Sequence, residues 1–265
     1  MKITDAHAHI FPQKISLKAS KSIGHFYDIE MHHDGMAHVL AECEKEAGIE
    51  RMLVCSTATT PHQVEAINDF IFEKCKKYPQ FVGLATLHQD MEDPEREIER
   101  IIGMGLHGIK LHPDFQKFPI DDERMFPTYK VLEKKRLPIL FHTGDCRYDF
   151  SGPRRLINLM EHFPDLVCIG AHFGGYSEWE HARLYPKSEN LYFDTSSSLW
   201  TMPKEEACEF IEYFGDDRFL FGSDFPMWTP KEELSRFLAL GLSEETNKKI
   251  LNGNFERLFG LEGKE

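Results

Sequence analysis

Histidine and aspartate residues stand at the ends of several short apolar segments of this 265-residue chain. His7 and His9 close the first such segment, in the order Asp-Ala-His-Ala-His. Residues two apart on a strand point to the same side, so these two imidazoles can converge on one metal ion. An H-x-H pair alone is a weak signal, because two histidines at a strand end are often only polar surface residues. Its value depends on what the other segments supply.

Three later apolar segments also end in a histidine or an aspartate, at His142, His172 and Asp224. Imidazole is the usual nitrogen ligand for divalent metals, and a carboxylate adds an oxygen donor. This donor set suits zinc, and manganese, iron and cobalt stay open because the order of affinities does not choose among them. We therefore predict one divalent-metal centre.

The elements that must position these residues recur with a regular spacing. Eight apolar segments occupy residues 3–7, 52–56, 81–87, 108–112, 138–142, 167–172, 191–195 and 219–223. From the second onward they start 24 to 30 residues apart, which is enough for one strand, one helix and two loops. Their lack of polar alternation is typical of parallel strands covered on both faces.

This pattern predicts a (β/α)8 TIM barrel that forms a single domain over residues 1–265. The alternative is a doubly wound open sheet, but no G-x-G-x-x-G follows the first segment. Helix punctuation agrees with the count: Asp93-Pro94 should open one helix, and a last helix is expected over 243–259. Residues 11–33 form a long connection, expected to be either a cover over the active-site mouth or a surface excursion.

Composition excludes several classes of protein. The chain has 31 Lys and Arg against 44 Asp and Glu, a net charge of −13, which argues against nucleic acid as a partner. No apolar run approaches the roughly 18 residues of a membrane span, and the N-terminus is too polar for a signal peptide. Its six cysteines form no C-x-x-C pair. We expect a soluble cytoplasmic protein with a small-molecule substrate. A homodimer is expected only because dimers are common among proteins, and no sequence feature points to it.

The full set of motifs resembles the amidohydrolase superfamily, in its amidohydrolase 2 branch. These motifs are D-A-H-A-H-I-F, G-I-K-L-H-P, F-H-T-G, G-A-H-F-G-G, L-Y-F-D-T-S, F-G-S-D-F-P and the closing I-L-N-G-N-F-E-R-L-F-G-L, between residues 5 and 261. The resemblance implies one divalent ion held by His7, His9, His142 and Asp224. It places His172 either on the ion or on its bound water, so Asp224 and His172 are the expected catalytic residues.

Six further residues are expected to line the substrate pocket: Lys110, His112, Phe115, Arg147, Trp200 and Trp228. Lys110 and His112 would bind an anionic or carbonyl part of a substrate, and Arg147 would bind a substrate carboxylate. In some superfamily members a lysine at the position of Lys110 is carboxylated and bridges two metals, so a binuclear site is an alternative. A local ion pair is the alternative for Lys110 and for Arg147, and simple packing is the alternative for the aromatic residues.

The function predicted first is hydrolysis of a small anionic substrate, such as a lactone, a cyclic amide or an amide, by metal-activated water. The alternative is a metal-dependent, non-oxidative decarboxylase of an aromatic or enoic acid, a type that the resembled branch also contains. The short chain favours hydrolysis mildly, because the decarboxylases resembled tend to carry larger insertions. A catalytically silent binding protein would have lost ligands, and here none is missing.

Overall fold

The computed structural model describes residues 1–263 and divides into two compact units. Unit 1 comprises residues 1–55, 74–82 and those from 194 onward, and unit 2 comprises residues 56–73 and 83–193. Each unit is built from short parallel strands and the helices between them. The single domain expected over the whole chain stays a prediction.

Strand β1 of unit 1 carries the H-x-H motif. It spans Thr4–His9 and pairs in parallel with β2 (Arg51–Cys55), which is followed in the sheet by β3 (Phe81–Gly83). The register shifts between Asp5 and Ala8, so β1 holds one residue more than the stretch of β2 opposite. A bulge of this kind changes the direction of nearby side chains, and here it lies at the histidine motif.

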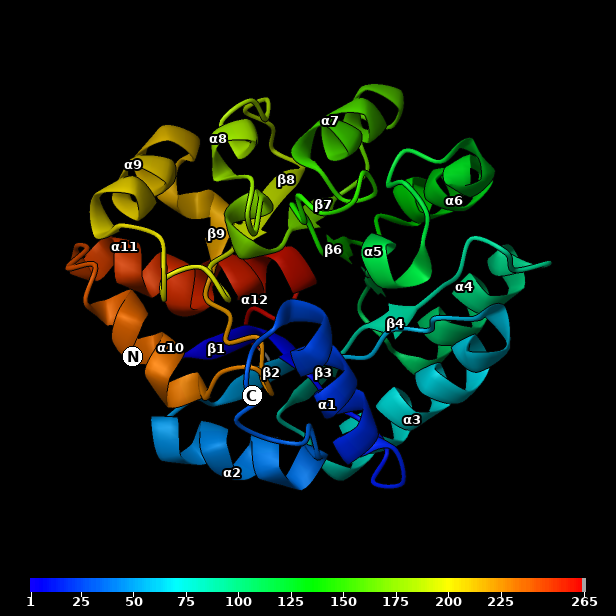
Figure 1. Ribbon diagram of the computed structural model, residues 1–265, viewed down its shortest axis with the longest axis horizontal. Helices are drawn as coiled ribbons and strands as arrows, with labels where there is room; N and C mark the ends of the chain where they lie inside the picture. The colour runs from blue at the N-terminus through cyan, green and yellow to red at the C-terminus, as the bar shows by residue number, and fades with distance from the viewer. Residues whose placement is uncertain (264–265) are drawn as a thin grey trace. The chain divides into compact units, whose positions relative to one another are not determined.

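Several helices of unit 1 accompany these strands along the chain. They are α1 (Ser16–Tyr27), α2 (Ala37–Ala47), α9 (Lys204–Phe214), α10 (Pro230–Leu238), α11 (Glu244–Lys248) and α12 (Asn254–Phe259), with strand β9 (Phe219–Leu220) between α9 and α10. Helices α2 and α10 pack side by side (Figure 1). Helix α10 begins with a reciprocal cap between Thr229 and Glu232, with Pro230 at its first position.

Unit 2 contains a run of parallel strands that are buried along their whole length. They are β4 (Ala85–Thr86), β5 (Ile109–Leu111), β6 (Ile139–Phe141), β7 (Cys168–Gly170) and β8 (Leu191–Asp194), adjacent in that order; Asp194 itself belongs to unit 1. Their residues are apolar almost without alternation, which is the composition expected for parallel strands covered on both faces.

Short helices connect the strands of unit 2. They are α4 (Pro94–Met104), α5 (Pro113–Gln116), α6 (Phe126–Lys135), α7 (Pro153–His162) and α8 (Trp179–Ala182), and α3 (Val64–Lys77) begins in this unit. The predicted start of α4 is confirmed, because the Asp93 carboxylate accepts a hydrogen bond from the Arg96 amide at 3.1 Å. Helices α4 and α6 lie next to each other (Figure 1).

Three segments differ from the sequence prediction. The strand expected over 81–87 is two strands separated by Leu84, because β3 pairs with β2 whereas β4 pairs with β5. The connection 11–33 contains helix α1. The helix expected over 243–259 is interrupted by a π-helical turn, Lys249–Gly253, whose Ile250 carbonyl accepts a hydrogen bond from the Phe221 amide. No helix within residues 1–263 has the length and apolar character needed to span a bilayer.

Gly144, in the F-H-T-G motif, tests how tightly the loop after β6 is packed. Its φ is +88°, and a Cβ there would lie 2.2 Å from the carbonyl carbon of Gly175. Gly144→Ala should therefore lower the free energy of unfolding by about 2–4 kcal/mol in a denaturant titration followed by circular dichroism. Gly103→Ala is the matched control: this helical glycine has open space around it, and the change should raise stability by about 0.5–1 kcal/mol. Equal effects of the two substitutions would contradict this account.

Candidate active site

In unit 1 the ends of β1 and the segment after β9 bring together three of the predicted metal ligands. The Nε2 atoms of His7 and His9 are 3.1 Å apart. Asp224 Oδ1 lies 3.4 Å from His9 Nε2 and 3.7 Å from His7 Nε2. The structure thus places the two imidazoles of the H-x-H motif on the same side, with the carboxylate facing both.

These spacings fit a shared divalent ion. Donor atoms that bind one ion at about 2.0–2.2 Å lie roughly 3.0–3.5 Å from each other, depending on the coordination number. The three donor atoms here lie 3.1 to 3.7 Å apart, two nitrogens and one oxygen. The chemistry of this donor set also matches the ions expected from the sequence, since imidazole and carboxylate bind zinc, manganese and related metals.

The other ring nitrogen of His7 has two buried partners. His7 Nδ1 lies 2.9 Å from Asp194 Oδ2 and 3.0 Å from Ser196 Oγ, and the Ser196 hydroxyl donates to Asp194 Oδ1. A carboxylate at Nδ1 holds the proton there and leaves the Nε2 lone pair available for a metal. Sequence reasoning assigned no role to Asp194, although the strand-end motif L-Y-F-D-T-S contains it.

His9 has a thiol as its second neighbour. Its Nδ1 lies 3.5 Å from Cys55 Sγ on the adjacent strand β2. Burial opposes a charge on this imidazole, but the nearby Cys55 and Asp224 outweigh it and raise the pKa of His9 to about 9. Binding of a cation at Nε2 requires that proton to leave.

Asp5 connects the two backbone segments that carry these ligands. Its buried carboxylate accepts hydrogen bonds from the amides of His7 and Ser223, each at 2.9 Å, and from the Ser223 hydroxyl. Burial raises the pKa of Asp5 against the lowering effect of these hydrogen bonds and of one from Glu44. The sequence pointed to the histidines of D-A-H-A-H, whereas its first residue fixes the backbone around them.

Two more carboxyl groups are buried in unit 1. Burial, together with the neighbouring Asp5, raises the pKa of Glu44 on α2 well above its ordinary value. Burial also raises the pKa of Glu233 on α10 to about 8, although its ion pair with Arg236 acts in the opposite direction. These groups carry protons at a pH where exposed carboxyl groups are ionised.

In unit 2 a second cluster contains the histidines predicted at the ends of β6 and β7. His142 Nδ1 and His172 Nε2 are 3.1 Å apart. The ring of His142 stacks on that of His112 at 4.0 Å between centroids, and His112 stacks on Phe115 at 3.8 Å. The structure therefore places the predicted pocket residue His112 beside a predicted ligand, with Phe115 stacked on His112.

Asp114 adds a carboxyl group that the sequence prediction missed, although it follows G-I-K-L-H-P directly. Its Oδ2 is 3.7 Å from His142 Nε2. Burial raises the pKa of Asp114 to about 7, against the lowering effect of Ser151. His112, Asp114 and His142 lie close enough for one ion, but the two imidazoles are nearly parallel. Their lone pairs run side by side and converge poorly on a common point.

The remaining predicted pocket residues have mixed surroundings. Lys110 is fully buried in β5. Arg147 binds the Asp145 carboxylate with two nitrogens, at 2.9 and 2.6 Å, which is the local ion pair named as its alternative. In unit 1 the rings of Trp200 and Trp228 are 5.5 Å apart. Contact of these side chains with a substrate, and a carboxylated Lys110, stay predictions.

Two predicted functional residues, Asp224 and His172, have backbone conformations that are unusual outside glycine. Positive φ occurs at Asp224 (+60°) and Ser197 (+48°) in unit 1, at His172 (+61°) and Phe173 (+54°) in unit 2, and also at Asp28, Lys117 and Arg136, which end helices. Each such residue costs on the order of 1–3 kcal/mol and persists where the surroundings enforce it, most often at functional sites.

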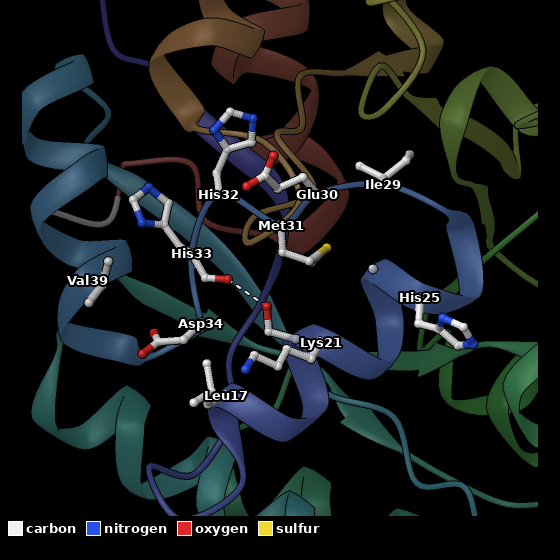
Figure 2. Close-up of a pocket in the computed structure, with 12 residues that line it drawn as sticks. Leu17, Lys21, His25, Ile29, Glu30, Met31, His32, His33, Asp34 and Val39 are labelled. Carbon is white, nitrogen blue, oxygen red and sulfur yellow. Dashed lines mark hydrogen bonds between the residues drawn. The ribbon is translucent and has the colours of Figure 1, made fainter.

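A cavity of about 620 Å³ lies in unit 1 between α1 and residues 29–34. Figure 2 shows Lys21 and His25 on one side and His32 and His33 on the other, with the Ser20 hydroxyl donating to the His33 carbonyl at 2.7 Å. The predicted site residues are not among those that line it. His33 stacks on Phe225, so one wall of the cavity touches the segment that follows Asp224.

The chain matches the family model described as Amidohydrolase over residues 4–261. It belongs to the amidohydrolase family. The gamma-resorcylate decarboxylase of Polaromonas sp. (strain JS666 / ATCC BAA-500) is 27% identical to this amidohydrolase over an alignment of 281 positions, which covers 82% of this chain and 85% of the relative. The resemblance inferred from the motifs is thereby confirmed, and the protein is an enzyme of the amidohydrolase superfamily.

Solved structures confirm the fold. An uncharacterised TIM-barrel protein from Bordetella bronchiseptica matches this amidohydrolase with a TM-score of 0.78 at 22% identity, over 100% of both chains. A dihydroxybenzoic acid decarboxylase from Polaromonas sp. JS666, with bound manganese and the inhibitor 2-nitroresorcinol, matches with a TM-score of 0.74 at 20% identity, over 98% of this chain and 97% of that one. The amidohydrolase has the predicted TIM-barrel fold.

The buried carboxyl groups predict how stability depends on pH. Glu233 holds its proton up to about pH 8 in the folded protein, compared with its ordinary value of 4.5. Because the folded state binds more protons in this range, the free energy of unfolding should fall as the pH rises from 4.5 to about 8. Glu233→Gln should remove part of this loss, on the order of 2 kcal/mol, in urea titrations at a series of pH values. Glu205→Gln, at an exposed position on α9, is the control, and a wild-type pH slope in Glu233→Gln would refute the assignment.

Proposed function

We propose that this amidohydrolase is a divalent-metal-dependent, non-oxidative decarboxylase of a small hydroxy-substituted benzoic acid. The observation that carries the proposal is the intact His7, His9 and Asp224 donor set in a chain whose curated relatives include gamma-resorcylate decarboxylases. The first of these aligns along 82% of this chain. The similarity therefore extends well beyond the metal-binding motifs.

The comparisons favour decarboxylation over the hydrolysis that we expected first. The alignment with the first decarboxylase relative spans 281 positions but covers 82% of this 265-residue chain, so that relative carries insertions that this chain lacks. The similarity along most of both chains outweighs the length argument for hydrolysis. Both reactions would use the same donor set. They differ in whether the group beside the metal is water or the substrate itself.

His7, His9 and Asp224 are the residues in unit 1 that would hold the ion. When bound, a divalent ion supplies positive charge that orients the oxygen atoms of a substrate and stabilises negative charge on them. The manganese in the Polaromonas structure supports manganese beside zinc as the metal. His142 as a further ligand, and His172 beside it, stay predictions from the motifs.

Decarboxylation of an aromatic acid needs a proton at the ring carbon that carries the carboxylate. Once that carbon is protonated, the C–C bond breaks, its electron pair returns to the ring and carbon dioxide leaves. We assign the proton to Asp224, whose carboxylate faces the two histidines. Asp194 keeps its partner His7 in the tautomer that this arrangement needs.

Unit 2 contains groups that suit the substrate's own chemistry. Lys110, His112 and Arg147 are positively charged or polar and would bind a carboxylate or a phenolic oxygen. For Arg147 this requires exchange of the Asp145 carboxylate for that of the substrate. Phe115 and His112 already stack face to face, and a flat aromatic acid would suit the same environment.

The activity test separates the two reactions. The protein, loaded with manganese or zinc, should release carbon dioxide from 2,6-dihydroxybenzoate or a related hydroxybenzoate, with the phenol as the other product by chromatography. Asp224→Asn should lower kcat about 10²- to 10⁴-fold, because the amide cannot deliver the proton. Asp217→Asn is the control: Asp217 is close to Asp224 in the sequence but is not one of the proposed ligands, so this variant should keep wild-type activity. Hydrolysis of lactones or amides without release of carbon dioxide would refute the proposal.

Metal content provides an independent test. Elemental analysis should find about one divalent ion per chain, and a chelator should remove both the ion and the activity. Asp194→Asn should weaken metal binding about 10- to 100-fold, because His7 would lose the carboxylate that fixes its tautomer. Full activity in a metal-free protein would contradict the mechanism.

A further inference from the structure

The two oxygens of the Asp224 carboxylate have different partners. Oδ1 faces the imidazoles of His9 and His7, at 3.4 and 3.7 Å. Oδ2 accepts a hydrogen bond from the Ser197 hydroxyl at 2.6 Å. A short hydrogen bond to an ionised carboxylate is among the stronger hydrogen bonds in proteins, so Oδ2 is held in place by Ser197.

Ser197 is in turn oriented by Trp228. The indole Nε1 of Trp228 donates to Ser197 Oγ at 3.0 Å. An indole N–H can only donate, and the Ser197 hydroxyl has a single proton to donate. In this row of two hydrogen bonds Trp228 therefore donates to Ser197, and Ser197 donates to Asp224. Met227 Sδ, at 3.5 Å, is the other acceptor near this hydroxyl, and a thioether is much weaker than a carboxylate.

Trp228 is itself held by its neighbours. The guanidinium of Arg236 lies 4.7 Å from the centroid of its ring, and the ring of Trp200 packs at 5.5 Å. Arg236 is paired with the buried Glu233 on the same helix, α10. The indole donor thus belongs to a packed group and does not depend on Ser197 for its position.

Ser197 and Asp224 share an unusual backbone conformation, so the positions of their side chains depend on the hydrogen bond between them. Ser197 and Asp224 both have φ in the left-handed region, at +48° and +60°. Side chains on such residues point in directions that ordinary strand or helix positions do not reach. The hydrogen bond between the two side chains joins two strained backbone segments 27 residues apart.

We propose that Ser197 and Trp228 are positioning residues of the metal centre, which hold the Asp224 carboxylate with Oδ1 toward the histidines, where it would meet the ion. The inference rests on the metal-dependent function proposed above. The Ser197 hydroxyl takes one acceptor position of Oδ2 and fixes the orientation of the carboxylate, which favours Oδ1 as the atom that would bind the ion. Without Ser197 the carboxylate can turn and offer both oxygens or neither.

The test measures metal affinity rather than turnover. Metal-free, full-length protein is titrated with Mn²⁺ and with Zn²⁺ by isothermal calorimetry, in the wild type, Ser197→Ala, Trp228→Phe and Trp200→Phe. Ser197→Ala should raise the Kd about 10- to 100-fold, the usual effect of losing a partner of a metal ligand. Trp228→Phe keeps a ring beneath Arg236 but loses the N–H, and should raise the Kd by a smaller factor.

Trp200→Phe is the matched control. Its indole Nε1 donates to the Ser197 carbonyl at 3.1 Å and not to the hydroxyl, so its loss should leave the Kd within twofold of the wild type. A purely structural role for this aromatic group would instead lower the melting temperature of the metal-free protein similarly in Trp200→Phe and Trp228→Phe, with no change in metal affinity.

A spectroscopic measurement checks the binding mode. Co²⁺-loaded Ser197→Ala should show a weaker visible absorption than Co²⁺-loaded wild type, because a second carboxylate oxygen raises the coordination number. Unchanged affinity and spectra in both Ser197→Ala and Trp228→Phe would overturn the inference, as would a wild type that binds no divalent ion. A wild type that binds one ion but decarboxylates no hydroxybenzoate would refute the proposed reaction and leave the positioning role supported.

Discussion

The buried carboxylate of Asp5 is the interaction on which the proposed metal centre depends most. It accepts hydrogen bonds from the backbone amides of His7 and Ser223. One side chain therefore fixes both the strand end that carries the histidines and the segment that carries Asp224. The register shift in β1 occurs at the same place, and the extra residue gives the strand the freedom to place its histidines. Geometry at the ligands is thus set by a residue that does not face them.

Fixing the ligands in this way requires groups that are unfavourable elsewhere. Unit 1 buries Asp5, Glu44 and Glu233, and burial raises the pKa of each carboxyl. Positive φ angles at Ser197 and Asp224 add backbone strain. Folded proteins tolerate such costs where packing of the surrounding elements enforces them, here through a core of many buried apolar residues on the strands and helices.

The choice between hydrolysis and decarboxylation shows how far a donor set can define a function. Two imidazoles and a carboxylate suit a divalent metal ion, but such a centre can orient either water or a substrate carboxylate. The decarboxylase relatives favour the second, and the groups of unit 2 that accompany His142 are compatible with an aromatic acid. The reaction therefore depends on residues outside the ligand motifs.

The sequence by itself determined the features whose signals are local. Strand positions, the convergence of His7 and His9 and the start of α4 at Asp93 depend on neighbours a few residues away, so their pattern can be recognised along the chain. The spacing of the eight apolar segments predicted the barrel, and the end of the last segment marked Asp224 as a candidate ligand.

Only the tertiary structure decided which side chains meet. Asp194 lies 187 residues from His7, and Trp228 lies 31 residues from Ser197, so no local pattern links either pair. The division of 81–87 into two strands follows from which strands pair, and the ion pair of Arg147 follows from the path of its loop. Hydrogen-bond partners such as these are set by how distant segments pack, and their distances depend on the whole fold rather than on spacing in the sequence.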